Sequence, residues 1–311
     1  MRGGGIFYAG AVAILIAGYA AAASGINDYY FYAAYIVLQY VVIATAWNIL
    51  GGYAGYVNFG SAGFYAVGAY TAAILYQLVK PPLVVMILGG GIAAGVIGLA
   101  AGYLTLRVKG VYFAIATLAL AVVLETIVAN WDYVGGTRGT YVLRPHHAFG
   151  FVNYPRALFF AMLVLAIGSV VLARVIERSK LGRGLAAIRD DEQAAESSGV
   201  PTLRLKLFAA TLSGALMGVA GAPFPYYVSH LEPGSAFSLA IAVNAIAMPM
   251  IGGATSWVGP VIGALLLGGA QQIATVTISS ILNLLIVGLL LIGFVIFAPD
   301  GLVGLFRKLR R

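Results

Sequence analysis

The feature that most constrains this chain is a succession of long apolar runs separated by short polar stretches. A helix needs about 20 apolar residues to cross a membrane. We count ten runs near that length, at residues 6–23, 30–50, 57–79, 83–106, 110–131, 156–176, 205–228, 237–252, 259–280 and 282–298. Over the 311 residues 61% are hydrophobic and 9% charged, whereas a soluble domain carries about 25% charged residues. We therefore expect an all-α polytopic membrane protein with about ten transmembrane helices, folded as a single domain over residues 1–311.

Two glycine patterns qualify this plain reading. The stretch 51–63 is rich in glycine and polar residues, and irregular backbone at membrane depth is tolerated only where protein or water covers it. We expect a broken or re-entrant segment there. In two other runs, glycines recur every three or four residues, at Gly91, Gly95 and Gly98 and at Gly214 and Gly218. Small residues let helices approach closely in lipid, so these faces predict helix–helix contacts.

The basic residues are distributed unevenly over the expected loops. Ten spans place fourteen of the eighteen cations on one side: Arg2, Arg107, Lys109, Arg174, Arg178, Lys180, Arg183, Arg189, Arg204, Lys206, Arg307, Lys308, Arg310 and Arg311. Only Lys80, Arg138, Arg144 and Arg156 fall on the other. Cytoplasmic loops carry the excess of Lys and Arg, so both termini are predicted to be cytoplasmic. The net charge of +8 is then a sign of topology rather than of nucleic-acid binding. The first run also fits a cleavable signal peptide, but the side on which it places Arg2 favours an uncleaved span.

One long charged loop, residues 174–206, divides the apolar runs. Leu185, Ile188 and Ala195 are spaced as on one face of a helix, and Gly199 with Pro201 is a typical helix end. We expect a short amphipathic helix on the cytoplasmic side, in the loop 177–204. The alternative is an ordinary solvated loop, which has no need of an apolar stripe.

This loop resembles the coupling segment of ABC importer permeases, whose signature is Glu-Ala-Ala followed three residues later by Gly. Here the run is QAAESSG, residues 193–199, with Gln in the Glu position and Glu192 just before it. The longer stretch RSKLGRGLAAIRDDEQAAESSG, residues 178–199, resembles the LivM-type permeases of branched-chain amino acid importers. Further stretches follow in that family's order: Trp47–Tyr70, Gly110–Glu125, Asn130–Gly139, Leu205–Ala222, Ile251–Ala264 and Phe297–Leu305.

The resemblance implies a transmembrane subunit with one cytoplasmic coupling helix in a bacterial-type inner membrane. It also implies a second homologous permease, two cytoplasmic ATP-binding subunits that bind ATP and magnesium, and an extracytoplasmic solute-binding protein. The sequence has no phosphate-binding loop of the form GxxxxGK[ST], so we expect no cofactor on this chain and no ATPase activity of its own. The residues expected to contact an ATPase subunit are Arg183, Leu185, Ile188, Arg189, Glu192, Ala194, Ala195 and Gly199. Leu185 and Ile188 are expected to fill a groove on that subunit, with Arg183, Arg189 and Glu192 as its polar rim.

The resemblance defines the type of transporter better than it defines the solute. Branched-chain or other hydrophobic amino acids are expected, and urea, short amides or aromatic acids are the alternatives within the family. The first signature commonly has Gln and His where this chain has Tyr56 or Val57 and Ser61, and a Glu of a later span is replaced by Asn244.

Five polar residues lie in apolar surroundings and are candidates for the solute path: Asn58, Ser61, Thr117, Glu125 and Asn244. A few polar groups in an apolar cavity are typical of binding sites, but each also fits a role in capping or bracing helices. Glu125 is the one acid expected deep within a span, where charge is costly. The chain has no cysteine, and its histidines, His146, His147 and His230, lie in loops without further ligands, so we expect no metal site. A membrane enzyme needs more buried acids or bases, and a passive channel does not explain the charged helix.

Overall fold

The computed structural model describes residues 2–24, 26–143, 151, 153–277, 288–289, 293 and 301–304. The helices that precede the charged loop are α1 (Arg2–Ala23), α2 (Asp28–Ala54), α3 (Ser61–Val79), α4 (Leu83–Thr105), α5 (Val111–Ala129), η1 (Asp132–Val134), η2 (Gly136–Arg138) and α6 (Tyr154–Arg178). The loop and the segments after it form α7 (Lys180–Asp190), α8 (Glu192–Ser197), α9 (Thr202–Gly221), α10 (Phe224–Val228), α11 (Pro233–Ala236), α12 (Leu239–Gly252), α13 (Val258–Gly263), η3 (Ala264–Gly268) and α14 (Gly269–Thr277). Two short strands, β1 (Thr140–Tyr141) and β2 (His230–Leu231), pair antiparallel.

Eight helices in the described part of the chain are long and apolar enough to cross a membrane, and they coincide with the first eight predicted runs. The ninth run is the shorter apolar stretch Val258–Ala274. The tenth, residues 282–298, lies almost wholly outside the described residues. An all-α polytopic membrane protein is therefore confirmed.

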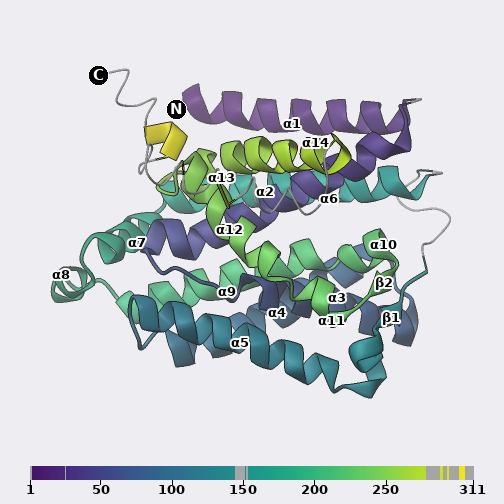
Figure 1. Cartoon of the computed structure of the whole chain (residues 1–311). Helices are drawn as coiled ribbons and strands as arrows, with labels where there is room; N and C mark the ends of the chain where they lie inside the picture. The colour runs from purple at the N-terminus through teal and green to yellow at the C-terminus, as the bar shows by residue number, and fades with distance from the viewer. Residues whose placement is uncertain are drawn as a thin grey trace.

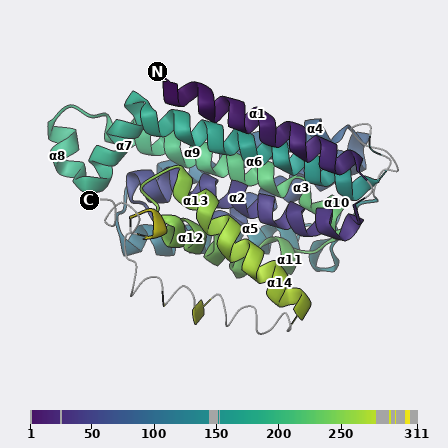
Figure 2. The same cartoon turned by 90° about the horizontal axis from the view of Figure 1, so that it is seen from above.

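The long helices lie side by side in one bundle, with the charged loop at one end and the β1–β2 pair at the other (Figures 1 and 2). α2 runs through the middle, and every residue from Val41 to Ala54 is buried. A helix that is apolar all round belongs in the interior of such a bundle. α1, in contrast, lies along the outside against α6, with most of its surface open to the surroundings.

The predicted glycine contacts join α3, α4 and α9. A Cβ atom at Gly218 would overlap the Gly90 carbonyl oxygen and the Ala94 side chain of α4. A Cβ at Gly98 would lie 3.1 Å from the Ala210 carbonyl oxygen of α9. Gly218 has room only for hydrogen and Gly98 for little more, so the helix axes approach closely, as the spacing predicts.

The predicted break is also present. α2 ends at Ala54, Gly55 adopts φ +77°, and residues 55–60 are irregular rather than helical before α3 begins at Ser61. Tyr56, Asn58 and Gly60 are buried in this segment, so the irregular backbone is covered by protein, as membrane depth requires. We call residues 55–60 the α2–α3 segment.

Among the described residues, the cations divide between the two ends as the span count predicts. Lys109, Arg183 and Arg189 lie at the end that carries α7 and α8, where α1 also begins (Figures 1 and 2). Arg138 ends η2, two residues before β1 begins at the other end, and there Arg156 forms an ion pair of 2.9 Å with Asp28.

Candidate functional site

The charged loop forms two short helices rather than the single helix that the sequence predicts. α7 ends at Asp190 and α8 begins at Glu192, because Asp191 takes an extended conformation with φ −159°. Its carboxylate accepts hydrogen bonds from the backbone N–H groups of Gln193 (2.9 Å) and Ala194 (3.1 Å), which caps α8. The predicted end is correct: Gly199 follows α8 with φ +83°.

The apolar stripe of the loop faces its own bundle. Leu185 and Ile188 are 1% and 3% exposed, and with Ala195 they join a cluster that includes Tyr53 of α2 and Ala209 of α9. The expectation that Leu185 and Ile188 fill a groove on an ATPase subunit is therefore wrong for this structure. The apolar stripe is instead covered by helices of the same chain.

Glu192, the first residue of α8, is the centre of a compact charge cluster. One carboxylate oxygen accepts from Lys206 Nζ of α9 at 2.6 Å. The other accepts from the Tyr56 hydroxyl of the α2–α3 segment at 2.6 Å and lies 3.1 Å from Lys109 Nζ, in the α4–α5 connection. Lys206 Nζ also donates to the Tyr56 hydroxyl (3.0 Å) and to the Leu106 carbonyl oxygen (3.3 Å). We call Glu192, Lys206, Tyr56 and Lys109 the Glu192 cluster.

The electrostatics of this cluster favour the ionised carboxylate. Partial burial by itself raises the pKa of Glu192, but the hydrogen bonds from Lys206, Tyr56 and Lys109 outweigh it and hold the pKa below its usual value. Burial and the neighbouring carboxylate raise the pKa of the Tyr56 hydroxyl, which therefore stays a donor. The Glu192 carboxylate is bound by groups of its own chain and is 13% exposed, and its expected place on the rim of a partner contact stays a prediction.

A second carboxylate fastens the other side of the loop. Glu177, in the last turn of α6, accepts from the backbone N–H of Trp257 at 2.6 Å and from the Tyr53 hydroxyl at 3.5 Å. Arg189 donates from Nη1 to the Gly52 carbonyl oxygen at 3.4 Å and pairs with Asp190, so it is only half open to solvent. Arg189 thus joins α7 to α2, Glu192 joins α8 to α9, and Glu177 joins the end of α6 to α2 and to the residue before α13.

The outward surface of the loop is a hollow of about 460 Å³ between α7 and the turn that precedes α9. Arg183 and Gly199 line it, together with Ala187 and Pro201. Ala194 is also exposed on α8, whereas Ala195 is buried. Of the predicted coupling residues, Arg183, Ala194 and Gly199 therefore face outward.

Three of the five candidate path residues meet at the α2–α3 segment. Asn58 accepts from the Gly60 N–H at 2.8 Å, and the Ser61 hydroxyl donates to the Asn58 carbonyl oxygen at 3.2 Å. The Thr117 hydroxyl of α5 donates to the Ala114 carbonyl oxygen and accepts from the Phe59 N–H at 3.1 Å. All three side chains are buried, and these bonds brace the irregular segment against α5.

Asn244 belongs to a different polar group, at membrane depth. It accepts from Gln271 of α14 at 2.9 Å and donates to the Tyr40 hydroxyl of α2 at 3.4 Å. The sequence reading missed a neighbouring group around Gln39, whose amide donates to the hydroxyls of Tyr35 (3.1 Å) and Tyr65 (2.8 Å). A glutamine in the middle of the run 30–50 is the signal that could have found it.

Glu125 is half-buried on α5 and follows Phe113, Thr117 and Ala121, the buried residues of that helix, at a spacing of four. This spacing places it on the inward face. Among the described residues no group of three or more possible metal ligands occurs, and His146 and His147 lie outside them.

The chain is similar to known membrane transport proteins. Residues 29–295 match the family described as branched-chain amino acid transport system, permease component. The high-affinity branched-chain amino acid permease protein LivM of Escherichia coli K12 is 28% identical over 88% of this chain and 69% of its own length. The probable branched-chain amino acid permease LivH of Methanocaldococcus jannaschii is 27% identical over 82% of this chain and 85% of its own length. The L-arabinose ABC transporter permease AraH of Azospirillum brasilense is 25% identical over 70% of this chain and 64% of its own length. No solved structure matches the chain.

Proposed function

Because the chain belongs to the branched-chain amino acid transport permease family, we propose that it is the membrane subunit of an ABC importer for branched-chain or other hydrophobic amino acids. ATP is hydrolysed by two cytoplasmic partner subunits that carry ATP and magnesium. A second homologous permease completes the path, and an extracytoplasmic binding protein delivers the solute. The end of the bundle that carries α7 and α8 then faces the cytoplasm of a bacterial-type cell.

The observation that carries this proposal is the Glu192 cluster. A single carboxylate on α8 holds the α2–α3 segment, the α4–α5 connection and the start of α9. Displacement of α8 therefore acts on three places in the bundle at once. An ATPase subunit that pushes on the outward hollow at Arg183 and Gly199 would move the membrane helices without any direct contact to them.

The path of the solute is proposed from the polar residues at membrane depth. Glu125 faces inward on α5, and Asn244 is buried in a polar group with Tyr40 and Gln271. Asn58, Ser61 and Thr117 stay candidates of a second kind, because their bonds to backbone make them positioning groups for the segment beside the path. Glu125→Gln should alter uptake of solute and leave assembly unchanged if the residue faces the path.

Reconstitution tests the proposal. Proteoliposomes that contain this chain, its permease partner and both ATPase subunits should accumulate labelled leucine when ATP and the binding protein are supplied. Leucine flux without the ATPase subunits would identify a channel and contradict the proposal. Accumulation of L-arabinose, urea or an aromatic acid in place of leucine would support an ATP-driven importer but assign it a different class of solute.

A further inference from the structure

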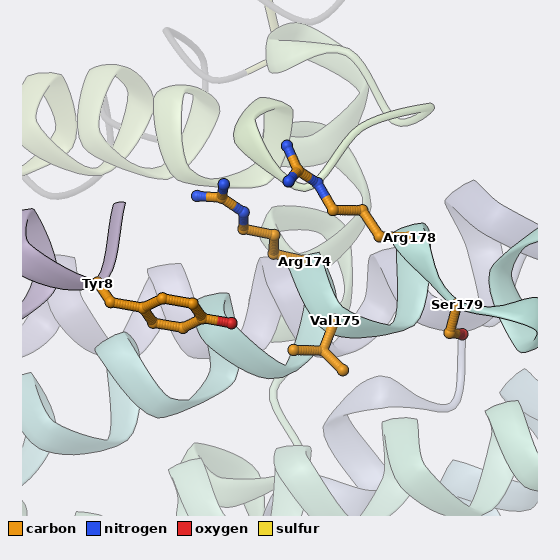
Figure 3. A pocket seen from close by; sticks show the side chains of 5 residues that line it. All are labelled: Tyr8, Arg174, Val175, Arg178 and Ser179. Carbon is orange, nitrogen blue, oxygen red and sulfur yellow. The ribbon is translucent and has the colours of Figure 1, made fainter. Parts of the chain in front are cut away.

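Two adjoining cavities lie where α1 crosses α6. The first, of about 230 Å³, opens at the α7 end of the bundle and is lined by Tyr8, Arg174, Val175, Arg178 and Ser179 (Figure 3). The second, of about 420 Å³, lies deeper along α1 and has an apolar lining from α1, α2, α6, α13 and η3. We call them the basic pocket and the apolar groove.

One face of α6 runs through both cavities. Leu163, Ile167 and Val170 line the apolar groove, and Arg174 and Arg178 follow at spacings of four. Residues at these spacings lie one above another on a helix. The side of α6 that lines the groove thus ends in two guanidinium groups.

Aromatic side chains mark the boundary between the two cavities. Phe7 and Trp257 both line the apolar groove, and the Arg174 guanidinium carbon lies 3.8 Å and 5.3 Å from their ring centroids. Arg174 is 6% exposed, so a buried cation stands directly at the end of an apolar slot. Aromatic rings and arginine occupy this level where a span meets the membrane–water interface.

The basic pocket presents groups suited to a phosphate. Both guanidinium groups extend to the same side of α6, and the Tyr8 hydroxyl reaches toward α6 from α1 (Figure 3). Glu177, the acid on the same turn, is held by the Trp257 N–H and the Tyr53 hydroxyl. The Ser179 hydroxyl donates to the Ile176 carbonyl oxygen. The basic residues of the lining are Arg174 and Arg178, and the planar fork of arginine binds phosphate oxygens in pairs.

We propose that these cavities bind one anionic phospholipid, with the phosphate against Arg174, Arg178 and Tyr8 and an acyl chain in the apolar groove. Basic pockets at the ends of spans bind acidic headgroups, and a phospholipid joins a phosphate to a chain at the required depth. Free phosphate would leave the groove unfilled, and an apolar helix would leave the exposed Arg178 without an anion. The bound lipid would fasten α1, the most exposed of the spans, to α2 and α6. This site does not depend on the proposed transport function.

Lipid retention by the purified full-length chain tests this site. Native mass spectrometry in detergent should show phosphatidylglycerol retained in preference to phosphatidylcholine, with no displacement by inorganic phosphate. Arg178→Gln should lower the preference about fivefold, the effect of one cation near a lipid surface. Arg183→Gln, which removes an exposed cation outside the pocket, should leave it unchanged. Arg178 is itself exposed, so the variant should fold.

A second pair of variants tests the apolar groove. A Cβ at Gly10 meets no atom within 4 Å, so Gly10→Leu fills the groove without a clash and should reduce retention of both lipids. Gly168→Leu places the same side chain on an equally open, exposed position of α6 outside the groove and should change nothing. Equal retention of the two lipids by the wild type, or equal effects of Arg178→Gln and Arg183→Gln, would overturn the proposal. The proposal would also be overturned if Gly10→Leu retained both lipids as the wild type does but no longer bound another permease subunit.

Discussion

The ammonium group of Lys206 lies 2.6 Å from the carboxylate of Glu192, although 14 residues and the turn at Gly199 separate them. The Lys206 side chain is 4% exposed and that of Glu192 13%. A charge pair this well covered is sensitive to the loss of one partner, because the other is then left in a poorly hydrated place. It joins the first residue of α8 to the first turn and a half of α9.

Removing the carboxylate should harm the protein more than removing Lys206. Glu192→Gln leaves two cations, Lys206 and Lys109, facing each other, and should cost about 3 kcal/mol of stability. Lys206→Met should cost less, because Lys109 still neutralises Glu192 at 3.1 Å. The melting temperatures of Glu192→Gln and Lys206→Met in detergent show which variant is less stable. The exposed Glu196→Gln on the same helix should match the wild type, and a Lys206→Met protein less stable than Glu192→Gln would contradict the argument.

The same pair predicts a response to acid. The pKa of Glu192 is lowered in the folded protein, so its contribution to stability is present above the unfolded pKa of about 4.3 and is lost as the pH falls through the folded value. The melting temperature of the wild type should therefore fall further between pH 6 and pH 3.5 than that of Glu192→Gln. Glu196→Gln should keep the wild-type drop. Equal drops in all three proteins would show that Glu192 carries no such linkage.

The spans and the break before α3 could be predicted because they depend on local composition. Long apolar runs fix the helices, and the glycines of residues 51–63 mark where helix is unfavourable. The Glu192 cluster could not be predicted, since Tyr56, Lys109 and Lys206 come from separate loops and each cation was already explained by topology. The burial of Leu185 and Ile188 was missed for a similar reason. An amphipathic pattern shows that a face is covered, but not whether the covering residues belong to the same chain.

Close packing of α4 and α9 predicts a severe effect at Gly218. A valine side chain there would overlap the Gly90 carbonyl oxygen and Ala94, and overpacking of this kind costs about 1–3 kcal/mol or more. Gly218→Val should therefore lower the yield of monodisperse protein and its melting temperature. Gly168→Val, at a helix position where a Cβ meets nothing within 4 Å, is the matched control. A Gly218→Val protein that melts with the wild type would mean that the two helices can separate at little cost.

The sidedness of the bundle can be measured directly, because the chain has no native cysteine. Glu196 on α8 and Glu232 before α11 are both exposed and lie at opposite ends. A cysteine at 232 should react with an impermeant maleimide added to intact cells, and one at 196 should react only after the cells are opened. Labelling of 196 in intact cells would reverse the orientation predicted from the basic residues.

The last prediction concerns Gly199, which ends α8 on the outward side of the loop. Its φ of +83° is open to glycine and, with small penalty, to asparagine, whereas a β-branched residue is strained there by about 1–2 kcal/mol. A Cβ at this position meets nothing within 4 Å, so a substitution acts through the backbone and not through a clash. Gly199→Val should therefore insert and fold, yet alter the turn that carries the outward hollow. Leucine uptake per ATP hydrolysed by the reconstituted importer should fall for Gly199→Val and stay near the wild type for Gly199→Asn. Leu185→Asp is a poor probe of the same contact, because it buries a charge inside the chain. If Gly199→Val retains full uptake and full solute-stimulated ATPase activity, the α7–α8 loop is not the element through which ATP hydrolysis drives the membrane helices.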